Sequence, residues 1–196
     1  MSPLPASEQP ARWWLVTFNT HGTWLPGDPR GFQTWRGRLH VPPPQRYAKP
    51  GEATYDPAPH RLRHAAAQRI MKGDPVHLTP KQQGCCLEAM VEEFDVIGVK
   101  PSILALNDWH VHTLIRVGGY PIRTAVGRLK AAASRLLSQY EIKPDKVWAQ
   151  GCHMKSKDDD GAVLAAFQYV RNHESEGALV HTWFHPLGGD VESKPR

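Results

Sequence analysis

The 196-residue chain has few cysteines and no long apolar run. Cys85, Cys86 and Cys152 leave at least one thiol unpaired in any disulfide scheme, and they lack the Cys-x-x-Cys spacing of a zinc site. They therefore predict reduced thiols in a cytoplasmic protein rather than a disulfide-stapled secreted one. No apolar stretch approaches the roughly 18 residues that indicate a membrane span. The N-terminus shows neither the basic nor the apolar region of a signal peptide, so we expect a soluble protein with no membrane partner.

Acidic residues are in the minority. The chain has 24 lysines and arginines against 19 aspartates and glutamates, which gives a formal net charge of +5. Its sequence pI is about 9.2. This balance favours a polyanionic partner such as a nucleic acid. The length suits one domain with one large insertion, and the 40% of apolar residues can form a buried core.

The most informative stretch is residues 107–117, which read Asn-Asp-Trp-His-Val-His-Thr-Leu-Ile-Arg-Val. Alternating β-branched residues after Asn-Asp predict a strand that leaves a hairpin, with residues 102–106 as its first arm. His110 and His112 would point to the same face of such a strand, so their imidazoles could converge on one metal ion. An isolated His-x-His is as readily a pair of ordinary surface or core histidines. The rest of the chain has to decide between these interpretations.

Hydrophobic periodicity predicts further strands and helices around this hairpin. We expect strands at 12–19 and 147–154, and helices from Thr79 to about Gly98, from Pro121 to about Tyr140, and after Asp158-Asp159-Asp160. Thr79-Pro80-Lys81-Gln82 has the spacing of a capping box with proline at the first helical position. The aspartate triplet is interpreted as an N-cap, because three consecutive carboxylates do not easily converge on a metal. In the helix after Pro121, the apolar face is expected to include Leu129, Leu137 and Tyr140.

A segment rich in proline and arginine covers about residues 26–63. So long a connection without regular structure is usually functional or disordered. Arg36 and Arg38 stand close to Trp35, a mixture that suits phosphates and stacked bases. A solvated insertion with no ligand explains the same composition equally well.

The last predicted helix has two stripes of residues. Val163, Phe167 and Val170 form its core face. Residues three and four apart stack on a helix, so a second stripe runs along its flank. The members of this stripe are Ala162, Ala166, Tyr169 and His173. A lone helical tyrosine usually only packs, but a Tyr-x-x-x-His pair in a chain with a His-x-His strand favours a functional interpretation.

His110-Val111-His112, the downstream Tyr169 helix and the order of elements between them resemble the HUH-type single-tyrosine transposases, which include insertion-sequence and REP-associated enzymes. The opening Trp14-Leu15-Val16-Thr17-Phe18, with His21-Gly22-Thr23-Trp24, is similar to the N-terminal strand of one branch. Over residues 12–183 the resemblance implies a single α+β domain, a ferredoxin-like α/β sandwich with helices packed on an antiparallel sheet. Residues 1–11 and 184–196 would be tails. It also implies a homodimer, in which each site can borrow the tyrosine helix of the other subunit.

The resemblance further implies a chemistry. Tyr169 would be the nucleophile that forms a 5′-phosphotyrosine on single-stranded DNA next to hairpins, which conserves the energy of the bond for rejoining. A divalent metal, Mg²⁺ or Mn²⁺, would neutralise charge on the phosphate. Its ligands would be His110, His112 and His173. Because the third ligand is an imidazole where an amide or carboxylate is more usual, Zn²⁺ also fits. The candidate contacts to the DNA backbone are Arg123, Arg128, Lys130 and Arg135, with Arg36 and Arg38 from the insertion.

Three other interpretations stay open. The first is a catalytically inactive or domesticated protein that binds DNA hairpins without cutting them. The second is a metal-independent two-histidine phosphoesterase, for which His21-Gly22-Thr23 supplies one His-x-Thr motif, whereas the hydroxyl of His110-Val111-His112-Thr113 comes one place too late. The third is an adaptor module in which His110 and His112 are inert.

Overall fold

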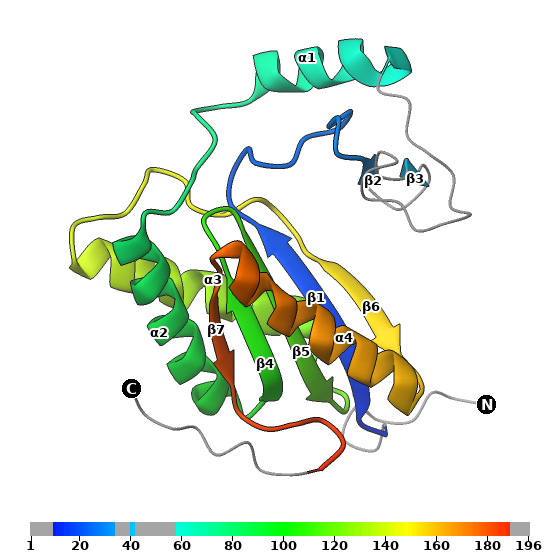
Figure 1. Ribbon diagram of the computed structural model, residues 1–196. Helices are drawn as coiled ribbons and strands as arrows, with labels where there is room; N and C mark the ends of the chain where they lie inside the picture. Colours follow the sequence, from blue (N-terminus) through cyan, green and yellow to red (C-terminus); the bar gives the residue numbers. More distant parts are fainter. Residues whose placement is uncertain (1–9, 34–39, 42–57, 189–196) are drawn as a thin grey trace. The chain divides into compact units, whose positions relative to one another are not determined.

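The computed structural model describes residues 10–33, 40–41 and 58–188 (Figure 1). The chain forms two compact units. The larger combines Met1–Thr20 with His77–Arg196, and the smaller is His21–Val76. The described residues of the segment that we expected to be an insertion, at about 26–63, all belong to the smaller unit. The assignment of one transposase domain with an insertion at about 26–63 stays a prediction.

A five-stranded antiparallel sheet organises the larger unit. Its strands lie in the order β6-β1-β5-β4-β7, so β5 is central and β6 and β7 are the edges. The strands are β1 (Arg12–Asn19), β4 (Lys100–Leu106), β5 (His110–Val117), β6 (His153–Lys157) and β7 (Leu179–Thr182). The β4–β5 hairpin has the position that the Asn-Asp turn predicted. The first predicted strand, at 12–19, is confirmed as β1.

Helices cover both faces of this sheet, as Figure 1 shows, with α4 on one face and α2 and α3 on the other. The bounds are α2 (Pro80–Ile97), α3 (Ile122–Gln139) and α4 (Asp160–Asn172), with a 3₁₀ turn, η4 (His173–Glu176), after α4. Under α4 lies an apolar core to which Leu15 of β1 and Leu114 of β5 contribute. Because side chains alternate along a strand, the buried Val16 and Phe18 point to the other face. The fold is therefore an α+β sandwich, as expected.

The smaller unit holds β2 (Phe32–Gln33) paired with β3 (His40–Val41), then a 3₁₀ turn, η3 (Ala58–His60), and α1 (Arg61–Ile70). The buried Asp28 carboxylate accepts hydrogen bonds from the Arg30 guanidinium, which also lies over the Trp24 ring. The His21 Nε2 donates to the carbonyl oxygen of Lys72 at 2.7 Å. Arg36 and Arg38 lie outside the described residues. Helix α1 was not predicted.

The helix-capping predictions are confirmed. Thr79 and Gln82 form the reciprocal capping box at the start of α2, and Gly98 ends this helix in the left-handed conformation with φ 66°. Asp159 caps α4, its carboxylate accepting from the backbone N–H of Ala162 at 2.7 Å. Residues near a helix end satisfy its unpaired backbone groups, so the ends of a helix can be predicted from a few neighbouring residues of the sequence.

Two predictions about the larger unit are wrong. The strand expected at 147–154 begins only at His153, because Gly151 has φ 77° and interrupts the extended backbone. Tyr140 was expected in the core, but it is 52% exposed and stands at the C-cap of α3, where the helical periodicity no longer applies. In the described part of the chain, no helix has the length and apolar character needed to cross a membrane. The three cysteines are free thiols, as predicted.

Candidate metal and nucleophile site

Three histidines converge where the beginning of β5 meets the end of α4. His110 and His112 alternate on β5 and point to the α4 side of the sheet, and His173 follows α4 directly. All three are buried, with exposed fractions of 5%, 6% and 7%. One ligand atom from each lies within 4.8 Å of the others. The structure therefore brings together the three histidines that we expected to be ligands.

Hydrogen bonds fix the orientation of two of these rings. The Nδ1 of His173 lies 2.9 Å from the carbonyl oxygen of Tyr169. A carbonyl can only accept, so Nδ1 carries the hydrogen and Nε2 keeps a lone pair for a metal. The Nδ1 of His112 lies 2.8 Å from the hydroxyl of Thr17, which is paired with His112 across the β1–β5 ladder. A polar partner on the far ring nitrogen is the usual outer support of a metal-bound histidine.

The electrostatics of this cluster suit a cation. Burial lowers the pKa of His112 well below its usual range, and the neighbouring His110 and His173 lower it further. The neutral imidazole, which is the form that binds metals, is therefore favoured at neutral pH. The site also lies at the C-terminal end of α4, where the helix dipole places partial negative charge. Three imidazole nitrogens are a donor set that Zn²⁺ and Mn²⁺ accept readily, and Mg²⁺ less so.

Tyr169 stands beside the histidines on the last turn of α4. Its hydroxyl lies 3.5 Å from the Nε2 of His112, and its ring is 4.8 Å from the ring of His173. The side chain is 46% exposed, so a large substrate can reach it. Burial of the hydroxyl raises the pKa of Tyr169, and Glu176 raises it further. A partly exposed phenol thus lies next to a candidate cation site, and all four side chains come from one chain.

Searches against protein-family models and against curated proteins found no match. A solved structure does match, that of a REP-associated tyrosine transposase bound to a REP hairpin. The match covers 90% of this chain and 74% of that one, with a TM-score of 0.50 and 8% identity. The chain therefore shares the overall fold of that solved structure. At 8% identity the likeness concerns the fold alone.

Helix α3, with its basic residues, lies on the sheet face opposite α4 and Tyr169. The ammonium group of Lys130 lies over the ring of Phe18, which points away from α4, and donates to the carbonyl oxygens of Ala149 and Gly151. Arg128 forms an ion pair with the buried Glu93. Two of the predicted DNA contacts therefore already bind groups of the chain itself.

The two remaining α3 candidates, Arg123 and Arg135, are exposed. Arg135 lies 3.7 Å from Glu93 in a weaker ion pair. The role of the α3 cations in DNA binding stays a prediction.

One feature of the site was missed at the sequence level. Thr17 was expected only as part of the strand at 12–19, although its hydroxyl contacts His112. This contact depends on which strands are neighbours in the sheet, and no local pattern in the sequence carries that information.

Proposed function

We propose that this chain is a metal-dependent endonuclease and strand transferase for single-stranded DNA, which cuts and rejoins strands at hairpin-flanked sites through a 5′-phosphotyrosine. The observation that supports this most directly is the Tyr169 hydroxyl next to three convergent, buried histidines. The likeness in fold to a solved tyrosine transposase supports it independently.

His110, His112 and His173 are the residues that would hold the metal, and their nitrogen donors fit Mn²⁺ or Zn²⁺ better than Mg²⁺. A bound divalent ion would supply Lewis-acid polarisation of a phosphoryl oxygen. Thr17 and the carbonyl oxygen of Tyr169 hold two of the three rings in place. Little reorganisation of the protein is then needed when the site is loaded.

The Tyr169 oxygen would attack the phosphorus and form a new P–O bond as the bond to the 3′ oxygen breaks. The phenol loses one proton and the released 3′-hydroxyl gains one, so protons balance over the step. Because burial raises the pKa of Tyr169, the phenol is protonated at neutral pH before the reaction. In the reverse direction, a 3′-hydroxyl attacks the phosphotyrosine and restores a phosphodiester, so no ATP is consumed.

A nucleic-acid substrate is supported by the basic balance of the chain and by the hairpin held by the structural neighbour. A single strand suits the site better than a duplex, since a flexible strand can present one phosphate between Tyr169 and the histidines. The four side chains of the proposed site lie together in one chain, so the proposal needs no residue from a second subunit. A homodimer stays a prediction. The alternative function is hairpin binding without cleavage.

The test is a gel assay for a covalent complex. The wild-type protein is incubated with labelled single-stranded hairpins from the flanks of its own gene, with Mg²⁺ or Mn²⁺. We expect a denaturant-resistant adduct that needs the metal and disappears in Tyr169→Phe. Tyr140→Phe is the matched control, because Tyr140 is also about half exposed but lies at the end of α3.

The outcomes separate the two functions. If the wild type shifts the hairpin on a native gel and forms no adduct with either metal, the binding-only function replaces the proposed one. If Tyr169→Phe still forms the adduct, Tyr169 is not the nucleophile.

A further inference from the structure

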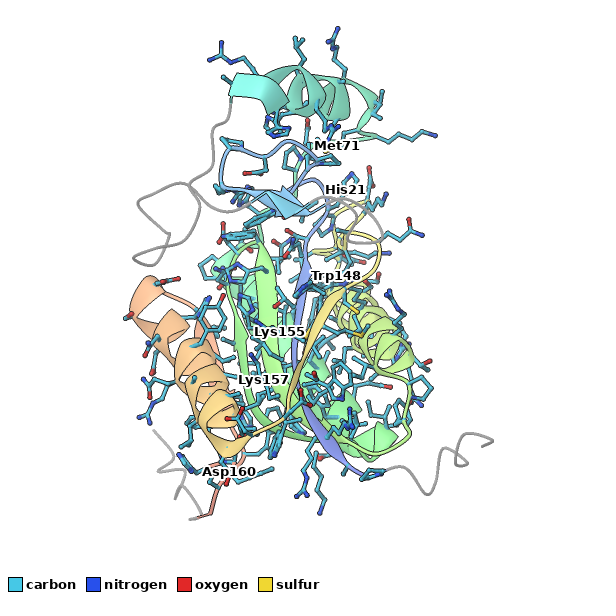
Figure 2. All side chains as sticks on the ribbon, turned by 90° about the vertical axis from the view of Figure 1, so that its right-hand side faces the viewer. His21, Met71, Trp148, Lys155, Lys157 and Asp160 are labelled. Carbon is cyan, nitrogen blue, oxygen red and sulfur yellow. The ribbon has the colours of Figure 1, made fainter. Side chains whose placement is uncertain are left out.

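The edge strand β6 has a row of basic side chains on the face of the sheet that α4, the helix of Tyr169, covers. This row, which we call the edge row, consists of His153, Lys155 and Lys157. They are paired across the β1–β6 ladder with Thr17, Leu15 and Trp13 respectively. Directly paired residues point to the same face of a sheet. Figure 2 shows Lys155 and Lys157 on the α4 side of β6.

The edge row is close to the nucleophile. Thr17 is paired with His153 on one side and with His112 on the other. His153 is thus two strand spacings, about 10 Å, from a candidate metal ligand. His153 and Lys155 are exposed, and Lys157 is partly exposed. A strand whose scissile phosphate lies at Tyr169 therefore reaches the edge row within a few nucleotides.

The spacing of the row suits an extended phosphate backbone. Alternate residues of a strand are about 6.7 Å apart, a separation that consecutive phosphates of a stretched single strand can match. Arg116 adds an exposed cation near the far end, since it is paired with Trp13, which in turn is paired with Lys157. The carboxylates of residues 158–160 follow at once and would repel a phosphate, so they mark the end of the row.

We propose that the edge row holds the phosphate backbone of the single-stranded DNA that leads to Tyr169, with Lys155 and Lys157 as positioning residues. The proposal rests on the proposed function. It adds the path by which the DNA strand would reach Tyr169 and the three histidines. It places the path on the α4 side of the sheet, opposite the cations of α3. No chemistry is assigned to the two lysines, so their loss weakens binding and leaves the maximal rate of cleavage unchanged.

The experiment compares Lys155→Gln/Lys157→Gln with the wild type. Binding of a fluorescein-labelled hairpin with a single-stranded extension is followed by fluorescence anisotropy over a range of salt concentrations, in EDTA so that cleavage cannot occur. Lys81→Gln/Lys143→Gln is the matched control. It removes the same charge from two exposed lysines near the start of α2 and the end of α3. Circular dichroism checks that each variant is folded.

The expected effect follows from counterion release. Each phosphate contact on a single strand contributes about 0.7 to the slope of log K against log salt, so two lost contacts lower the slope by about 1.4. Relative to 1 M salt, where counterion release no longer contributes, this difference in slope corresponds to about 25-fold weaker binding at 0.1 M salt. The control should keep the wild-type slope, and Lys155→Arg/Lys157→Arg should restore binding. In the adduct assay with Mn²⁺, the glutamine variant should need more DNA for half-maximal rate.

Equal slopes and affinities for the edge-row variant and the control would overturn the proposal. If the wild type forms the adduct in that case, only the substrate path is wrong and the proposed function stands. If the wild type neither binds the DNA nor forms the adduct, the proposed function and the edge-row proposal fail together.

Discussion

Thr17→Val tests whether the hydrogen bond to His112 prepares a metal site. Thr17 Oγ1 lies 2.8 Å from the Nδ1 of His112, and the two residues are paired across the β1–β5 ladder. Valine has the same branched shape and fits a strand, so the change removes the hydroxyl and little else. Loss of an outer partner of a metal-bound histidine typically lowers metal affinity by about 10- to 100-fold. This corresponds to about 1.4 to 2.7 kcal/mol of binding free energy.

The assay is a competition titration of the protein with Mn²⁺ or Zn²⁺ against a chromophoric chelator. Thr113→Val is the matched control. Its hydroxyl donates to the carbonyl oxygen of Ile103 at 3.0 Å, and it lies next to His112 in sequence but on the opposite face of the sheet. Each variant should lose about 1 kcal/mol of folding free energy, the usual value of one hydrogen bond. Only Thr17→Val should also lose metal affinity.

Two results would refute this reasoning. If Thr17→Val binds the metal as tightly as the wild type, the hydroxyl does not orient His112. If both variants lose metal affinity to the same extent, the loss reflects a general loosening of β5 rather than the contact with the ring.

Three further predictions concern the third ligand, the predicted cations of α3 and the start of α2. His173→Ala should lower metal affinity more than Thr17→Val does, because it removes a donor of the cluster itself, and the same competition titration would detect it. If α3 also contacts DNA, Arg123→Gln/Arg135→Gln should weaken hairpin binding by about five- to eight-fold per arginine at 0.1 M salt, for a contact to a single strand or to the duplex stem respectively. Unchanged anisotropy would remove α3 from the DNA interface. Thr79→Ala breaks the capping box of α2 and should cost about 1 kcal/mol in urea unfolding. An unchanged midpoint would contradict that role of the cap.

The sequence predicted those parts of the fold that depend on local periodicity and local hydrogen bonding. The capping box at Thr79 and the left-handed Gly98 concern only neighbouring residues, and both are confirmed. Predictions failed where a local sequence pattern continues beyond the end of the element itself. Gly151 interrupts the strand expected at 147–154, and Tyr140 continues the helical pattern of α3 although it stands at the C-cap.

The candidate site divides in the same way. A period of two places His110 and His112 on one face of a strand, and a step of four places Tyr169 and His173 on one stripe of a helix. The sequence by itself therefore determined which side chains share a face within each element. It also determined the basic balance of the chain, without showing where the charge acts.

Only the tertiary structure decided which faces meet. Strand pairing places Thr17 against His112 and brings Lys155 to the α4 side of the sheet, and the packing of α4 brings His173 to the two strand histidines. The tertiary structure also directs the Lys130 ammonium group to the carbonyl oxygens of Ala149 and Gly151. The physical reason is that periodicity fixes the direction of a side chain within its own element, whereas its neighbours are set by long-range pairing and burial. Those act between segments far apart in the chain.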